Sequence, residues 1–207
     1  RNAYLVSAND VEIGINDINI TTPTLETDIN TNVANTKIDI KINSTTTKTV
    51  NLVNEIYLND SLIKSNTKEV ALSIGSNSVT DNIQINNPTL WDEYNGNLYT
   101  LKTYIKINGV ICYSTETKYG YRYFKFDKDT GLWLNGKNIK LRGVCMHHDL
   151  GCLGAEVNKS AIERQIRILK NMGCNAIRIT HNPASTEFLE VCAKEGMLLI
   201  EELFDCW

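Results

Sequence analysis

Polar side chains gather in three short stretches of the sequence, each directly after an apolar run. They are His147-His148-Asp149, His181-Asn182 and Glu201-Glu202, and Arg178 lies inside the apolar run before the second stretch. Imidazole, carboxylate and amide groups can ligate zinc, act as a general base with an orienting carboxylate, or hold the hydroxyls of a sugar. All three histidines of the chain lie in these stretches, which indicates a functional pocket.

Three chemistries compete for these residues. A zinc site would draw on all three stretches for its ligands: His147, Asp149, His181 and Glu202. However, the sequence lacks the HxxxH or HxH spacing that puts two ligands on one face. A nucleophilic site would need Cys145, which sits inside an apolar run without a sharp turn. Binding of sugar hydroxyls, with Trp207 stacking on a ring, fits the mixture best. Histidines that satisfy loop backbone groups are the structural alternative.

The elements that must position these residues change character near residue 120. Before it, apolar residues alternate with polar ones, as in Ile38, Ile40 and Ile42, which is typical of half-buried antiparallel strands. Asn108-Gly109 predicts a tight hairpin turn. Six or seven such runs predict that residues 1–120 form an immunoglobulin-like β-sandwich.

From residue 121 the pattern alternates strands with helices. Asn135-Gly136 predicts a second hairpin, which leads into a strand ending at Met146. The stretch SAIERQIRILKNMG predicts a helix with a capping box of Ser160 and Glu163. NAIRIT is then a strand, STEFLEVCAKEG a helix capped by Ser185 and closed by Gly196, and MLLIEE a strand. Two βαβ units of this kind predict a parallel sheet, whose site forms at the carboxyl ends of its strands.

The alternation in NAIRIT also predicts where Arg178 points. Ile177 and Ile179 share the face that suits helices outside the sheet, so Arg178 points to the opposite face, the lumen of a barrel. A guanidinium buried there needs a carboxylate partner. That pair could tie strands together or position a catalytic carboxylate, and the spacing favours neither.

Composition excludes several classes of protein. With 42% hydrophobic residues, 22% charged residues and a net charge of -3, the chain has the balance of a globular protein that binds neither nucleic acid nor a membrane. No apolar run is long enough to span a bilayer, and the first residues lack the pattern of a signal peptide. Six scattered cysteines without a CxxC pair favour small buried residues in a reducing compartment over disulfides.

The sequence around the polar stretches resembles a known family. LRGVCMHHDLGCLGAEVN, RQIRILKNMGCNAIRITHNPAS and EFLEVCAKEGMLLIEELFDCW closely resemble the opening of the catalytic barrel in glycoside hydrolase family 2, which contains β-galactosidases, β-glucuronidases and β-mannosidases. NPTLWDEYNGNLYTL and GYRYF resemble the end of its immunoglobulin-like domain, and RNAYLVSA the last strand of its jelly-roll domain. The resemblance implies a multi-domain chain of all-β plus α/β class, with residues 121–207 forming the first βαβαβ units of a (β/α)8 TIM barrel.

The family pattern implies roles for individual residues. His147 and His181 match histidines that contact the sugar to be cleaved, and Arg178 matches an arginine next to the nucleophile. Glu202 matches the acidic residue that ends strand three, whereas Glu201 stands where Asp is usual. The expected sugar-binding set, drawn from all three stretches, is His147, His148, Asp149, His181, Asn182 and Glu202.

The same resemblance implies that no catalytic residue lies in this sequence. Retaining glycosidases use two carboxyl groups about 5 to 5.5 Å apart, and the family places them after barrel strands four and seven. The chain ends after strand three, so we expect the fragment alone to be inactive and to bind a β-galactoside or related sugar. The alternatives are a non-catalytic carbohydrate-binding module and a zinc hydrolase. No cofactor or metal is expected in it, although a divalent or monovalent cation could assist the full-length enzyme. We also expect a homo-oligomer, because a barrel cut at strand three leaves a strand edge unpaired.

Overall fold

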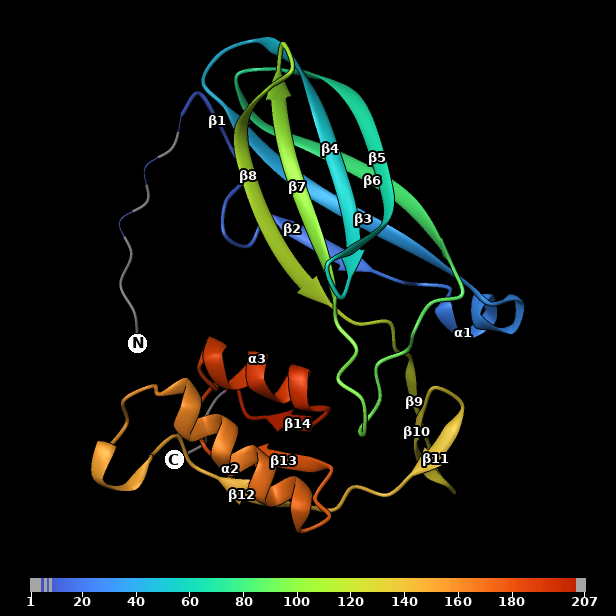
Figure 1. Cartoon of the computed structure of the whole chain (residues 1–207), viewed down its shortest axis with the longest axis vertical. Helices are drawn as coiled ribbons and strands as arrows, with labels where there is room; N and C mark the ends of the chain where they lie inside the picture. The colour runs from blue at the N-terminus through green and yellow to red at the C-terminus, as the bar shows by residue number, and fades with distance from the viewer. Residues whose placement is uncertain (1–4, 6, 8, 204–207) are drawn as a thin grey trace. The chain divides into compact units, whose positions relative to one another are not determined.

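A computed structural model describes residues 5, 7 and 9–203 of the chain. By contacts the chain divides into two compact units (Figure 1). The sandwich unit comprises the described residues up to Thr89 together with Leu98–Tyr121, and the barrel unit comprises Leu90–Asn97 with the described residues from Arg122. The strand expected in RNAYLVSA and the stacking role of Trp207 rest on residues outside the described part.

The sandwich unit contains two antiparallel sheets. One sheet consists of β1 (Val11–Glu12), β2 (Ile18–Thr21), β3 (Val33–Ser44) and β6 (Gly75–Asn86), with β3 paired to the other three strands. The other sheet has the order β5 (Ser61–Leu72), β4 (Lys48–Leu58), β7 (Tyr99–Ile107) and β8 (Val110–Tyr119). Helix α1 (Leu25–Asp28) and the 3₁₀ turn η1 (Ile29–Thr31) connect β2 to β3.

Alternating burial in these strands confirms the predicted period of two. Ile38, Ile40 and Ile42 are each at most 2% exposed, because successive side chains of a strand point to opposite faces. The predicted hairpin turn is also present between β7 and β8, where Asn108 and Gly109 both have positive φ angles of 50° and 82°. The sandwich predicted from the sequence is therefore confirmed.

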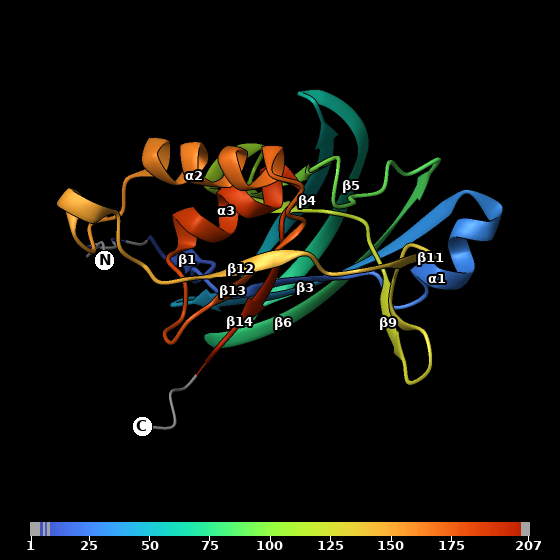
Figure 2. The same ribbon diagram turned by 90° about the horizontal axis from the view of Figure 1, so that it is seen from below.

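The barrel unit begins with a small antiparallel sheet of β9 (Phe124–Asp127), β10 (Gly131–Leu134) and β11 (Lys137–Ile139), which includes the predicted hairpin at Asn135-Gly136. A parallel sheet follows, in the order β12 (Gly143–Met146), β13 (Ala176–Ile179) and β14 (Leu198–Glu201). Helices α2 (Lys159–Asn171) and α3 (Thr186–Glu195) connect these strands and lie on one side of the sheet (Figure 2), and the 3₁₀ turn η2 (Gly151–Leu153) precedes α2. The predicted βαβαβ order is confirmed, and the described strands form no closed barrel.

The helix caps agree with the sequence for α3 and differ for α2. Ser185 Oγ accepts a hydrogen bond from Phe188 N at 3.2 Å, and Gly196 ends α3 with a φ of 68°, both as predicted. The capping box of Ser160 and Glu163 was wrong. The cap is Asn158, whose Oδ1 accepts from Ala161 N at 3.0 Å, so α2 begins at Lys159 and Ser160 lies in its first turn.

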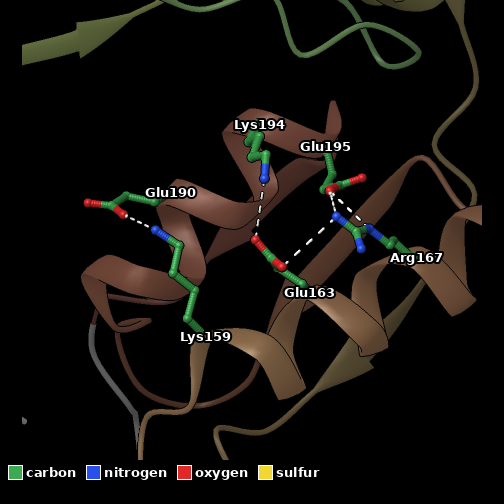
Figure 3. Close-up of polar contacts among 6 residues, drawn as sticks. All are labelled: Lys159, Glu163, Arg167, Glu190, Lys194 and Glu195. Carbon is green, nitrogen blue, oxygen red and sulfur yellow. Dashed lines mark hydrogen bonds and ion pairs between the residues drawn. The ribbon is translucent and has the colours of Figure 1, made fainter.

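Apolar packing joins the two helices to the sheet. Ile162 and Ile166 of α2 and Val191 of α3 bury against Ile177 and Ile179 of β13. On their exposed sides the helices are linked by ion pairs (Figure 3): Lys159 to Glu190 at 2.9 Å, Lys194 to Glu163 at 3.4 Å, and Arg167 to Glu195 at 3.1 Å. Arg167 also lies 3.9 Å from Glu163 within α2. The helices are thus held to the sheet by apolar contacts and to each other at the surface by charge.

The segment Leu90–Asn97, which lies between β6 and β7 in the sequence, is built into the barrel unit. Trp91 is 2% exposed, and its Nε1 donates to Ala193 O of α3 at 2.6 Å. Lys170 of α2 donates to the carbonyl oxygens of Glu93 and Gly196, and desolvation lowers the pKa of its amine. A segment from the first half of the sequence therefore stabilises the helices of the second half.

The cysteines only partly follow the prediction of small buried residues. Cys192 is buried, which raises the pKa of its thiol to about 12, and Cys112 and Cys174 are half-buried. Cys145 and Cys152 are exposed, because Cys145 lies on the sheet face opposite the helices and Cys152 lies in η2. All five described cysteines are free thiols. None of the described helices is long and apolar enough to cross a membrane.

Candidate functional site

The three polar stretches meet at one edge of the parallel sheet. His147 follows β12 directly, His181 follows β13 by two residues, and Glu202 follows β14 directly. Since the three strands are parallel neighbours, their carboxyl ends lie side by side. The prediction that strand order would gather these residues is therefore confirmed, because it depends only on the βαβ connections.

Arg178, His181 and Glu202 form a charged network on the lumen face of the sheet. Glu202 Oε1 pairs with the Arg178 guanidinium, and Glu202 Oε2 lies 2.9 Å from His181 Nδ1. Hydrogen bonding and charge attraction from Glu202 raise the pKa of Arg178, with a smaller contribution from Cys145. Desolvation raises the pKa of Glu202, but its bonds to His181 and Arg178 together outweigh this and hold the pKa below its usual value. Glu202 is thus ionised and holds both Arg178 and His181.

The predicted direction of Arg178 is correct, and its predicted burial is wrong. Ile177 and Ile179 pack into the apolar cluster under the helices, so Arg178 points to the opposite face. Its carboxylate partner is Glu202, which also holds His181. The Arg178 side chain is 51% exposed, because the three parallel strands leave this face open in the described structure.

His147 lies next to this network. Its ring centroid is 5.5 Å from that of His181, with the rings at 64° to each other. The loop that carries His181 is fixed at its start by Thr180, whose N and Oγ1 both donate to Met146 O, at 2.9 Å and 3.2 Å. The Thr180–His181 peptide bond is cis. The ends of β12 and β13 are therefore tied together where the two imidazoles meet.

A cavity of about 310 Å³, lined in part by His147, lies between the strand-end loops and the N-terminal parts of α2 and α3. Four predicted site residues line it: His147, His148, Asp149 and Asn182. Apolar side chains such as Ile162, Val157 and Phe188 form much of the remaining wall. The predicted residues therefore fall into two groups, a charged network of Arg178, His181 and Glu202 and a cavity wall, with His147 contributing to the cavity and contacting His181.

Sequence reasoning missed one contact at this edge. Glu201 Oε1 accepts a hydrogen bond from Ala184 N at 2.8 Å and so ties the end of β14 to the loop after β13. Two adjacent glutamates at a strand end must point to opposite faces. That alternation could have separated the roles of Glu201 and Glu202, but the partner of Glu201 lies 17 residues away on another loop.

The zinc ligands considered from the sequence do not converge. In residues 5, 7 and 9–203, no three His, Cys, Asp or Glu side chains are grouped so that they could hold a metal ion. Cys145 lies beside Arg178 in the parallel ladder, inside β12, without the turn that would present a nucleophile. The imidazole, amide and carboxylate groups at this edge can donate and accept hydrogen bonds, which suits a polar ligand.

Together, the sandwich, the opening of a parallel α/β barrel and the polar strand ends define a chain with an immunoglobulin-like domain and the start of a TIM barrel domain. Comparison with known families gives the same division. Glycosyl hydrolases family 2 matches residues 15–122, and the TIM barrel domain of glycosyl hydrolases family 2 matches residues 127–204. The chain belongs to glycosyl hydrolase family 2.

Individual relatives support this assignment. The chain is 47% identical over 128 residues to a β-galactosidase from Bacteroides ovatus, a match that covers 62% of this chain and 15% of that protein. A solved family 2 structure from Bacteroides cellulosilyticus matches 97% of this chain with a TM-score of 0.90 and 30% identity. A β-glucuronidase from Bacteroides uniformis, solved with a covalently bound cyclophellitol-6-carboxylate aziridine, matches 95% with a TM-score of 0.84 and 27% identity. The chain spans 26% and 24% of the lengths of these two solved chains.

Proposed function

We propose that this chain provides one wall of the sugar-binding subsite of a β-glycosidase, with a β-galactoside as the substrate. The observation that carries the proposal is the pair of imidazoles, His147 and His181, held 5.5 Å apart at the carboxyl ends of adjacent barrel strands. Neutral imidazoles both donate and accept hydrogen bonds, which suits the hydroxyls of a sugar. The β-galactosidase relative from Bacteroides ovatus supports this class of substrate.

In this proposal each group has a separate task. His147 and His181 contact sugar hydroxyls, while Glu202 holds His181 and is itself paired with Arg178 beside the sugar. His148, Asp149 and Asn182 contact the sugar or the group attached to it from the cavity side. Because Glu202 is ionised and paired with two cationic or polar partners, its role is to hold these neighbours in place and not to donate a proton.

Charge favours a neutral sugar over a uronic acid at this wall. A uronate carboxylate is best held by arginine or lysine, and the guanidinium of Arg178 already pairs with Glu202. Among the described residues that line the cavity, none is a lysine or an arginine. A β-glucuronide is the second candidate, because the Bacteroides uniformis relative is a β-glucuronidase.

We also propose that the chain alone hydrolyses no glycoside. Retaining glycosidases need two available carboxyl groups about 5 to 5.5 Å apart, and Glu202 is already engaged by Arg178 and His181. Calorimetry with methyl β-galactoside, methyl β-glucuronide and methyl β-mannoside tests the binding proposal, with His181→Ala as the variant that should abolish binding. Release of nitrophenol from nitrophenyl β-galactoside by the purified chain would contradict the proposed inactivity. Equal heats for all three sugars, or none, would contradict the proposed substrate.

A further inference from the structure

The two adjacent glutamates at the end of β14 act on opposite faces of the sheet. Glu202 points to the lumen face, where it holds Arg178 and His181. Glu201 lies on the helix face, two residues after Leu199, which packs against the apolar cluster under α2 and α3. Its half-buried carboxylate accepts from Ala184 N at 2.8 Å. One strand end therefore contacts the loop after β13 from both sides.

The position of Ala184 lets this bond restrain both the loop after β13 and the start of α3. Ala184 immediately precedes Ser185, the residue that caps α3. A carboxylate next to the first turn of a helix is also favoured by the partial positive charge of the free N–H groups there. The loop from Thr180 to Ser185 is thus fixed at its start by Met146 O, at the His181 ring by Glu202, and at its end by Glu201.

We propose that Glu201 is a positioning residue for sugar binding, which acts through the backbone of this loop on His181 and Asn182. The proposal rests on the proposed function, because it concerns the same subsite. Glu202 orients the imidazole of His181, but it can do so only if the loop backbone holds the ring within reach. Glu201 supplies that restraint three residues further along, where the loop turns into α3.

Four variants separate positioning from plain stabilisation. Glu201→Ala removes the acceptor, Glu201→Gln keeps an uncharged acceptor of the same length, and Glu201→Asp keeps the charge but withdraws it by one methylene. Glu190→Ala is the matched control, because Glu190 is a glutamate of the same unit that pairs with Lys159 at the surface. Each ¹⁵N-labelled protein is examined for Ala184 amide exchange, for the ¹⁵N and ¹H signals of the His181 ring, and for binding of methyl β-galactoside by calorimetry. His181→Gln assigns the ring signals.

We expect Glu201→Ala and Glu201→Asp to speed exchange of the Ala184 amide by about tenfold, the equivalent of one lost hydrogen bond. Both should displace the His181 ring signals and weaken galactoside binding several-fold. Glu201→Gln should retain most of the unmodified behaviour, and Glu190→Ala all of it. Should Glu201→Ala fail to fold, Glu201→Asp carries the same comparison.

Unchanged His181 ring signals in Glu201→Ala or Glu201→Asp would overturn the proposal, even with a lower unfolding midpoint, because Glu201 would then stabilise α3 without positioning the loop. Failure of Glu201→Gln to restore the signals would overturn it as well. If the unmodified chain binds no galactoside, the proposed function fails, but the ring signals still decide the role of Glu201.

Discussion

Replacement of Trp91 by alanine should destabilise the barrel unit more than most single substitutions. The indole is 2% exposed, its Nε1 donates to Ala193 O at 2.6 Å, and the Arg122 guanidinium lies 4.5 Å from its ring centroid. Its backbone oxygen also accepts from Asn135 Nδ2 at 2.9 Å. Trp91 thus joins α3 to the residues around the first barrel hairpin.

The magnitude follows from these contacts. Burial of about 200 Å² of aromatic surface contributes about 5 kcal/mol at roughly 25 cal/mol per Å². Truncation of a buried tryptophan costs about 3 to 5 kcal/mol, because the surroundings refill the cavity only in part. We therefore expect Trp91→Ala to lower the free energy of unfolding by about 4 kcal/mol, a large share of the roughly 5 to 15 kcal/mol of a typical domain. Trp91→Phe should lose about 1 to 2 kcal/mol, since it keeps a ring and loses the N–H donor.

Urea unfolding followed by far-UV circular dichroism measures this effect, because α2 and α3, the two long helices of the described structure, both belong to the barrel unit. Tyr94→Ala is the control, since Tyr94 lies in the same segment and is 72% exposed, and it should change the free energy by less than about 0.5 kcal/mol. A loss of under about 1 kcal/mol for Trp91→Ala would refute the idea that Leu90–Asn97 stabilises the barrel unit.

Four further outcomes can be checked with the same assay. Asn158→Ala should lower the stability of the barrel unit by about 1 kcal/mol and Ser160→Ala by much less; equal losses would contradict Asn158 as the cap. Gly196→Ala should lower the free energy of unfolding more than Gly173→Ala. Both glycines have positive φ, but an added Cβ at Gly196 would lie 2.8 Å from Asp92 O, whereas one at Gly173 would meet nothing within 4 Å. The reverse order would argue against this close approach. Because the pKa of Glu202 is lowered, its contribution to stability is complete above the ordinary glutamate pKa of 4.5 and is lost as pH falls through the lowered pKa. Glu202→Gln should therefore lose less stability than the unmodified chain between pH 7 and pH 3. Parallel losses would count against the pairing. Glu163→Gln should change the urea midpoint only slightly, because its ion pairs to Arg167 and Lys194 lie at the surface, and a large loss would show that the network is cooperative.

Local sequence signals predicted most of the secondary structure and the edge of the sheet where the site lies. The Asn-Gly turns at 108–109 and 135–136 need positive φ at adjacent residues, a demand that few other sequences meet. The change from a period of two to alternating strands and helices predicted the parallel sheet, and parallel strands necessarily bring His147, His181 and Glu202 to one edge. These features follow from a few neighbouring residues and from the connectivity of the chain.

Competition between nearby residues explains the error at the start of α2. Asn158 and Ser160 can both cap a helix, and the sequence pairs Ser160 with a glutamate three residues on. In the structure Glu163 instead pairs with Lys194 of α3, and Asn158 caps the helix one residue before Lys159. The sequence offered two local caps for one helix, and the Glu163 carboxylate that a capping box would need faces a partner 31 residues away.

The sequence by itself determined which residues stand at the strand ends and that Arg178 faces away from the helices, because alternation along a strand and the order of strands are local properties. Only the tertiary structure decided that Glu202 joins Arg178 to His181, that Glu201 holds Ala184 on the other face, and that Trp91 packs on α3. These contacts join residues that are 17 to 102 positions apart in the sequence. They depend on how helices and loops pack. The sequence is compatible with many partners for a carboxylate or an indole, and the folded backbone decides which partner lies within about 3 Å.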